Sequence, residues 1–123
     1  YPLSIHPQAQ KAAEATECAG EQGDYWAMHD KLFANQATLS ADNYKQWAGE
    51  IGLDHAVFDE CLDSGAMAEE VKRDQADGLS YGISGTTVFF INGKMLSGAK
   101  PFAAFDAAIQ EALAASAAAD SSQ

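Results

Sequence analysis

The sequence has 123 residues, of which 47% are hydrophobic, and its formal net charge is −11. The length suits one domain with a single core, and the negative charge opposes binding to nucleic-acid phosphates or anionic lipid, which both require a basic surface. No apolar run approaches the roughly 18 residues of a membrane-spanning helix, so we expect no nucleic-acid and no membrane partner. The sequence shows no signal-peptide pattern and begins with Tyr1 instead of Met, which we interpret as a processing, cloning or fragment boundary.

Two helices are predicted near the start of the chain. Pro7 suits the first turn of a helix, and the residues that follow favour a helix over about 7–20. Asp24 is placed to cap a second helix. The apolar side chains of this second helix recur at helical spacing, and we expect them to face the core. They are Trp26, His29, Leu32 and Phe33.

Three further helices follow in the sequence. The third and fourth begin after the cap residues Ser40 and Asp54, and they end at Gly52 and Gly65. The fifth covers about 67–79 and carries charged side chains over most of its surface. The core-facing residues expected on the third and fourth helices are Tyr44, Trp47, Ala48, Ile51, Val57, Phe58, Cys61 and Leu62.

After the fifth helix the pattern changes from helix to strand. Residues 86–91 form a β-branched and aromatic run, Asn92-Gly93 is a strong hairpin-turn signal, and residues 94–97 form the return strand. The first strand is apolar on both faces, which is typical of a strand inside a covered sheet. A two-stranded hairpin alone is marginally stable, and the only other extended-looking piece, residues 1–5, is short and contains a proline. We therefore expect further strands from a missing N-terminal segment or from another copy of the chain.

The last predicted helix begins at Pro101. Its apolar stripe consists of Phe102, Phe105, Ile109 and Leu113. The Ala/Ser/Asp-rich residues that follow have little to pack with, so we expect residues 116–123 to form a disordered tail.

The remaining polar residues give no further candidate site. The histidines are scattered and no Cys-x-x-Cys or His-x-x-x-His spacing occurs, so we expect no metal. Glycine-rich nucleotide loops are absent too, and we expect no cofactor. Acidic residues of the fifth helix alternate with Lys72 and Arg73, which favours a solvated face over an acid/base pair. The histidines are His6, His29 and His55, and the acidic residues of the fifth helix are Glu69, Glu70, Asp74 and Asp77.

Residues 18–26 read Cys-Ala-Gly-Glu-Gln-Gly-Asp-Tyr-Trp, with a histidine three positions later, and residues 84–93 read Ser-Gly-Thr-x-x-Phe-Phe-Ile-Asn-Gly. These motifs resemble those of the DsbA-like disulfide oxidoreductases. The resemblance implies an α/β, thioredoxin-like (DsbA-type) fold, truncated at the N-terminus. It also implies a single domain over residues 1–115, with a large helical insertion at 7–82 and a C-terminal β-hairpin plus helix at 84–114.

The sequence departs from the family pattern at two places. The family's active site is a Cys-x-x-Cys at the start of the first long helix, where the helix N-terminus lowers the pKa of a thiol that then exchanges disulfides. This motif is absent, so we predict no catalytic residue. The substrate groove implied by the resemblance includes Gly85, Thr86 and Thr87, but relatives carry a cis-proline at the last position. A cis bond before threonine costs about 3–4 kcal/mol, against about 1 before proline, so we expect trans at Thr86-Thr87.

Cys18 and Cys61 lie on separate predicted helices. The resemblance implies a structural disulfide, since some relatives pair cysteines placed in this way within the helical insertion. Such a bond would stabilise the fold by about 4 kcal/mol and would suit an oxidising compartment. The alternative is a pair of buried free thiols that act as small apolar residues.

The resemblance implies a thiol–disulfide oxidoreductase of the periplasm or a secreted protein, with polypeptide thiols and disulfides as partners. Without Cys-x-x-Cys, and with Thr87 in place of the cis-proline, we expect the chain to be inactive alone. The alternative is a non-catalytic binding or scaffold module. Such a module would complete its sheet by forming a homodimer through the exposed sheet edge.

Overall fold

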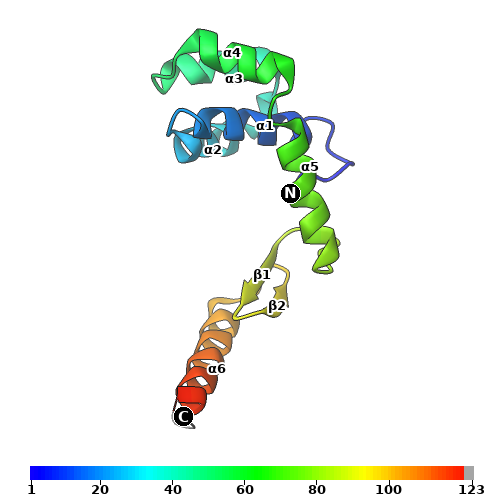
Figure 1. Cartoon of the computed structure of the whole chain (residues 1–123), viewed down its shortest axis with the longest axis vertical. Helices are drawn as coiled ribbons and strands as arrows, with labels where there is room; N and C mark the ends of the chain where they lie inside the picture. Colours follow the sequence, from blue (N-terminus) through cyan, green and yellow to red (C-terminus); the bar gives the residue numbers. More distant parts are fainter. Residues whose placement is uncertain (121–123) are drawn as a thin grey trace. The chain divides into compact units, whose positions relative to one another are not determined.

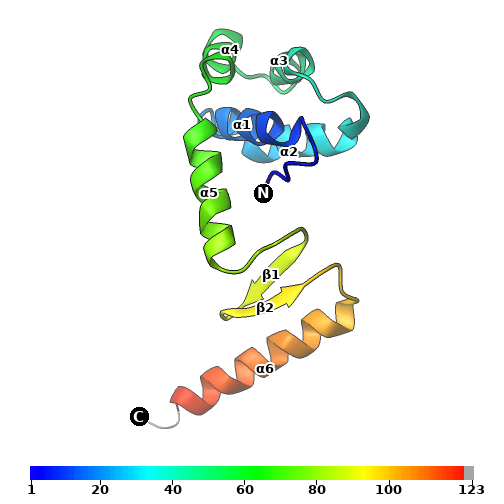
Figure 2. The same cartoon turned by 90° about the vertical axis from the view of Figure 1, so that its right-hand side faces the viewer.

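The computed structural model describes residues 1–120, and it divides the chain into two compact units, Tyr1–Gly82 and Ile83–Gln123 (Figures 1 and 2). The border lies beside the expected end of the helical insertion. The first unit is helical. Its elements are α1 (Ala9–Gly20), α2 (Tyr25–Ala34), the 3-10 helix η1 (Gln36–Thr38), α3 (Ala41–Glu50), α4 (His55–Ser64) and α5 (Ala68–Ser80).

Capping side chains fix where α3 and α4 begin. The Ser40 hydroxyl accepts a hydrogen bond from the Asn43 backbone N–H at 3.2 Å, and the Asp54 carboxylate accepts one from the Val57 N–H at 3.1 Å. The predicted caps at Ser40 and Asp54 are thereby confirmed. The prediction for Asp24 was wrong, since this residue precedes α2 but its side chain makes no capping bond. Helix α4 ends at Gly65, whose φ of +69° lies in the left-handed region that glycine adopts most readily.

The core of the helical unit lies between α1 and α2 on one side and α3 and α4 on the other, an arrangement that both views show (Figures 1 and 2). Tyr44, Phe58, Met28, Leu62 and Cys18 have the largest fully buried side chains. The predicted core residues of α3 are confirmed, since Tyr44, Trp47 and Ala48 are buried and Ile51 packs against them. On α4 the prediction was wrong for Val57, which is 53% exposed.

The predicted core face of α2 was also wrong in part. Trp26 and Phe33 are 70% and 65% exposed, and the buried residues of this helix are Met28 and Leu32. The helix carries two neighbouring apolar stripes, because Met28 and Leu32 lie four residues apart, as do His29 and Phe33. Helical periodicity alone does not decide which of two such stripes packs inward.

A disulfide joins α1 to α4 inside this unit. The Cys18 and Cys61 sulfurs are 2.00 Å apart and the Cα atoms 5.9 Å apart, and Cys18 is 1% exposed. A second tie lies nearby, because the Lys11 ammonium donates a hydrogen bond to the Leu62 carbonyl and pairs with the buried Glu14 carboxylate at 2.8 Å. Together these contacts fix α1 against the end of α4.

The second unit consists of an antiparallel hairpin and a long helix. Strands β1 (Val88–Ile91) and β2 (Lys94–Ser97) pair through an Asn92-Gly93 turn, and α6 spans Phe102–Asp120. Asn92 and Gly93 have φ values of +47° and +80°, as a type I′ turn requires. Phe89 packs edge-on against Phe105 of α6, with ring centroids 4.8 Å apart.

Helix α6 extends further than the sequence led us to expect. Residues 116–120, assigned to a disordered tail, continue the helix, whereas 121–123 lie outside the described residues. A run of alanines has the highest intrinsic helix propensity and extends the helix without needing a packing partner. Within the described residues the sheet has two strands, and residues 1–5 form coil and turn. No helix in this part of the chain combines the length and the apolar character needed to cross a membrane.

We predict that Asp54→Ala lowers the free energy of unfolding by about 1 kcal/mol, because a helix loses its N-cap bond. Asp24→Ala is the matched control, since it removes the same charge from a helix N-terminus where no capping bond forms. Both tryptophans lie in the helical unit, so urea unfolding followed by tryptophan fluorescence reports on that unit. Equal losses in the two variants would contradict the capping role of Asp54.

We predict that the chain, alkylated without reduction, gains no mass, and that it gains two alkyl groups after reduction. Replacing both cysteines by alanine is expected to lower the free energy of unfolding by about 4 kcal/mol, because the bond closes a loop between residues 43 positions apart. Alkylation of either cysteine in chain that has been kept oxidised would show that the disulfide is absent in solution.

Candidate functional site

The loop before β1 contains the residues that the resemblance assigns to a substrate groove. Thr86 and Thr87 are exposed, and the peptide bond between them is cis. Our expectation of a trans bond was wrong, because it rested on the preference of an isolated peptide bond. In the folded chain the Thr87 carbonyl accepts a hydrogen bond from the Gly98 N–H at 2.8 Å, which ties the loop to the end of β2. Threonine therefore has here the backbone isomer that the resemblance leads us to expect for a proline at this position.

The two cysteines and this loop belong to different units of the chain. Cys18 and Cys61 belong to the helical unit, whereas Gly85, Thr86 and Thr87 belong to the second unit. Both sulfurs are used in one disulfide, and there is no free cysteine among the described residues. The thiolate that disulfide exchange requires is therefore not supplied by either residue in the oxidised chain.

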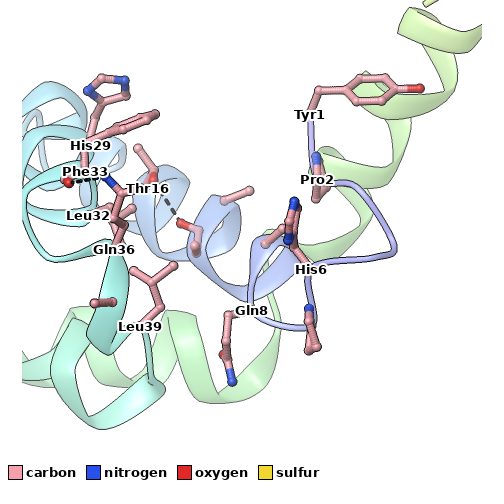
Figure 3. A pocket seen from close by; sticks show the side chains of 15 residues that line it. Tyr1, Pro2, His6, Gln8, Thr16, His29, Leu32, Phe33, Gln36 and Leu39 are labelled. Carbon is pink, nitrogen blue, oxygen red and sulfur yellow. Dashed lines mark hydrogen bonds between the residues drawn. The ribbon is translucent and has the colours of Figure 1, made fainter. Parts of the chain in front are cut away.

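A groove of about 640 Å³ lies in the helical unit between α1 and α2 (Figure 3). The small side chains of Ala9, Ala12 and Ala13 of α1 are among its lining residues. Figure 3 shows further lining side chains, some from α2 and some from the first residues of the chain. Those from α2 are His29, Leu32 and Phe33, and those from the N-terminal segment are Tyr1, Pro2 and His6.

An aromatic stripe on α2 extends from the groove along the helix surface. The rings of Trp26 and His29 lie 5.1 Å apart and those of His29 and Phe33 4.7 Å apart, measured between centroids. The His29 ring also lies 3.0 Å from the Asp30 carboxylate. This surface was not expected from the sequence, because helical spacing was taken to place the stripe in the core. Met28 and Leu32 already indicated the alternative, since they give α2 a second apolar side that can face the core.

A smaller hollow of about 210 Å³ adjoins the groove, since Tyr1, Pro2 and Ala13 line both. Its other lining residues include Glu17 of α1 and Asp74 of α5. The N-terminal segment is fixed beside it, because the Gln75 side-chain amide donates a hydrogen bond to the Pro2 carbonyl.

The carboxylates of this smaller hollow repel one another. The pKa of Glu17 is raised above its ordinary value, first by burial and then by the negative charges of Glu70, Asp74 and Glu21. The pKa of Tyr25, which also lines the hollow, is raised by burial and by Glu17 and Asp74. The hollow is therefore a region of negative potential.

The other acidic candidates of α5 behave as surface residues. Glu69 pairs with Lys72 at 2.8 Å on the exposed side of the helix, and this pairing lowers the pKa of Glu69. Within residues 1–120, no group of three or more His, Cys, Asp or Glu side chains is arranged to hold a metal ion.

We predict that Glu17→Gln stabilises the helical unit at pH 7. Because the folded chain raises the pKa of Glu17, it holds the proton more tightly than the unfolded chain. The stability that protonation provides is complete below the ordinary pKa of 4.5 and is lost as the pH rises through the folded value. The advantage of the variant should therefore be absent below pH 4.5 and grow as the pH rises above it, in urea unfolding followed by tryptophan fluorescence. Glu60→Gln, on the exposed surface of α4, is the control, and an equal profile for both variants would contradict this prediction.

Comparison with known proteins identifies longer relatives. The chain is 38% identical over 110 residues to the Na(+)/H(+) antiporter NhaA 1 of Salinispora arenicola and 41% identical over 114 residues to NhaA 3 of Salinispora tropica. Each alignment covers 89% of this chain but 17% of the relative. The NhaA of Herminiimonas arsenicoxydans is 38% identical over 96 residues, 78% of this chain and 16% of that protein. The chain thus spans about a sixth of the length of these relatives.

No solved structure gives a significant match to the chain. The profile of the DSBA-like thioredoxin domain, in contrast, matches residues 2–110. This match includes the helical unit, the loop at Thr86-Thr87, the hairpin and the first half of α6. The chain therefore belongs to the family of DSBA-like thioredoxin domains, and by resemblance to the thiol–disulfide oxidoreductases.

Proposed function

We propose that this chain is the non-catalytic part of a DsbA-like thiol–disulfide oxidoreductase domain and that it is inactive by itself. In this proposal the reactive dithiol, and the strands that complete the sheet, come from polypeptide outside residues 1–123. The chain would contribute the helical unit, the loop that faces the polypeptide substrate, and the closing hairpin and helix.

The state of the two cysteines is the observation that carries this proposal. Disulfide exchange begins when a thiolate attacks a disulfide sulfur, and an efficient enzyme presents that thiolate at an accessible place. The sequence contains two cysteines and no Cys-x-x-Cys, and the two are bonded to each other with Cys18 buried. This arrangement supports a structural use of both residues.

The loop at Gly85, Thr86 and Thr87 is the part of the chain that we propose to contact a polypeptide substrate. The exposure of Thr86 and Thr87 and the bond that ties the Thr87 carbonyl to Gly98 support this role. A loop held in one conformation presents its backbone groups to an extended peptide without a further ordering cost.

The longer relatives support a place for such a domain within a larger protein. Their names describe Na(+)/H(+) antiporters, and this chain resembles about a sixth of each. We propose that the DsbA-like domain is one part of a longer polypeptide of this kind and that it faces an oxidising compartment, the periplasm or the cell exterior. The Cys18–Cys61 disulfide supports that compartment, because such bonds persist where thiols are not kept reduced.

A second candidate function is a non-catalytic binding or scaffold module that forms a homodimer through the sheet edge. Apolar side chains exposed on the second unit favour it, since a monomer seldom exposes several in one small unit. They include Phe89, Met95, Phe102, Ile109 and Leu113, which are 42%, 44%, 84%, 45% and 59% exposed.

We predict that the chain alone shows no turnover above background in insulin reduction or in oxidation of a model dithiol peptide, because it supplies no reactive thiolate. A family member with Cys-x-x-Cys is the positive control, and the variant with both cysteines replaced by alanine is the matched negative control. Turnover that is present in the wild-type chain and lost in this variant would assign a redox activity to Cys18 and Cys61 and would contradict the proposal.

Light scattering after size-exclusion chromatography separates the two candidate functions. A compact dimer without redox activity favours the scaffold module. A monomer that gains activity when a strand and Cys-x-x-Cys segment is joined before Tyr1 favours the oxidoreductase.

A further inference from the structure

We propose that the groove between α1 and α2, together with the acidic hollow beside it, binds an extended polypeptide segment in which an apolar side chain is followed two residues later by Lys or Arg. This inference rests on the proposed function, in that it names a class of polypeptide that the domain would hold. It concerns the helical unit alone and is independent of the loop at Thr87.

The groove provides the apolar part of the site. Its volume of about 640 Å³ lies within the range of about 300–1,000 Å³ that is typical of ligand sites. Small alanine side chains of α1 line it, so a ligand can approach the helix backbone closely, and Phe33 adds an aromatic side chain to the lining. Trp26 and Phe33 leave large aromatic surfaces in water, and grouped surfaces of this kind mark places where another molecule binds.

The acidic hollow provides the charged part of the site. Glu17 and Asp74 line it, and Glu70 and Glu21 add to the negative potential at Glu17. Among the described residues, no lysine or arginine side chain forms an ion pair with Glu17 or Asp74, whereas Lys11, Lys31, Lys45, Lys72 and Lys94 each pair with another carboxylate. A cation brought by the ligand would relieve the repulsion, and the net charge of −11 would steer a basic segment toward this surface.

The geometry of α1 decides the spacing of the two side chains in the ligand. Ala13 borders both hollows and Glu17 lies one helical turn further, a rise of about 6 Å at roughly 1.5 Å per residue. In an extended peptide, side chains two residues apart point to the same side and are separated by about 6.6 Å. In a peptide that runs in the same direction as α1, as we propose, an apolar side chain over Ala13 therefore places the charge of the second following residue near Glu17.

The test is an amide NMR titration of the whole chain with three capped synthetic peptides. The probe is Gly-Ser-Leu-Ser-Arg-Ser-Gly, and its two controls replace Arg by Gln or Leu by Ser. We expect the probe to shift signals of α1 and α2 residues around Ala13 and Phe33. We expect the Gln peptide to bind about fivefold more weakly, since a single exposed ion pair contributes up to roughly 1 kcal/mol. The Ser peptide keeps the charge and is expected to bind more weakly because it loses the apolar contact with the groove.

Two sets of variants separate the halves of the site. The double variant Glu17→Gln, Asp74→Asn is expected to weaken binding of the probe about tenfold, since two charges are removed. Binding of the Gln peptide should be unchanged, because this peptide has no charge to pair with them. Asp77→Asn, which removes one charge from α5 outside the hollow, is the control and should bind as the wild type does. Phe33→Ala should weaken binding of the probe and of the Gln peptide to the same extent. Val57→Ala also truncates an exposed apolar side chain, but outside the groove, and should weaken binding of neither peptide. Dispersed amide spectra show that each variant is folded.

Several results would overturn the proposal. They are equal binding of the Arg and Gln peptides, shifts confined to the hairpin and α6, or no shift at millimolar peptide. A second copy in the groove would overturn it as well, and would appear as α1 and α2 signals that change when the protein is diluted in the absence of peptide. Redox turnover does not enter this titration. If the chain does not bind the peptides but gains redox activity when it is extended before Tyr1, only this site is contradicted. If it binds the peptides but gains no activity when extended, only the proposed function is contradicted.

Discussion

The packing of α1 against α4, fastened by the Cys18–Cys61 disulfide, is the interaction on which the helical unit depends. Cys18 lies in the buried stripe of α1, and Lys11 on the same helix bonds the carbonyl of Leu62 one residue beyond Cys61. The covalent bond and the hydrogen bond thus fix both the position and the rotation of α1. Because α1 also lines the groove and carries Glu17, this rotation determines which of its side chains face the two hollows.

Local signals in the sequence were sufficient for the ends of the first five α-helices, but not for the end of α6 or for the choice between apolar faces. A cap such as Ser40 or Asp54 acts through atoms a few residues away, so its effect can be derived from neighbours in the sequence. The burial of Met28 instead of Trp26 depends on which other helices lie beside α2, and those helices are distant in the sequence. The Thr86-Thr87 bond is a similar case, since its neighbour is Gly98 across the hairpin.

The family match establishes the fold of this chain, whereas its cysteines determine what chemistry it can perform. The match over residues 2–110 establishes the DSBA-like thioredoxin domain, whereas the reactive group of that family has no counterpart among the two bonded cysteines. In our proposals, the exposed features of the chain, which are the loop before β1 and the surface of α1 and α2, contact polypeptide, and the bonds are broken at a dithiol outside residues 1–123.

The burial of Cys18 also limits how the disulfide exchanges with outside thiols. Attack on the Cys18 sulfur is blocked by the surrounding core, since this residue is 1% exposed. Attack on the Cys61 sulfur would require Cys18 to leave as a thiolate in apolar surroundings, where a thiol has a raised pKa and is a poor leaving group. Both directions of exchange are therefore slow. A dithiol that cycles between oxidation states elsewhere in the same protein would leave this bond intact, so the fold could serve many redox turnovers without reshuffling its own disulfide.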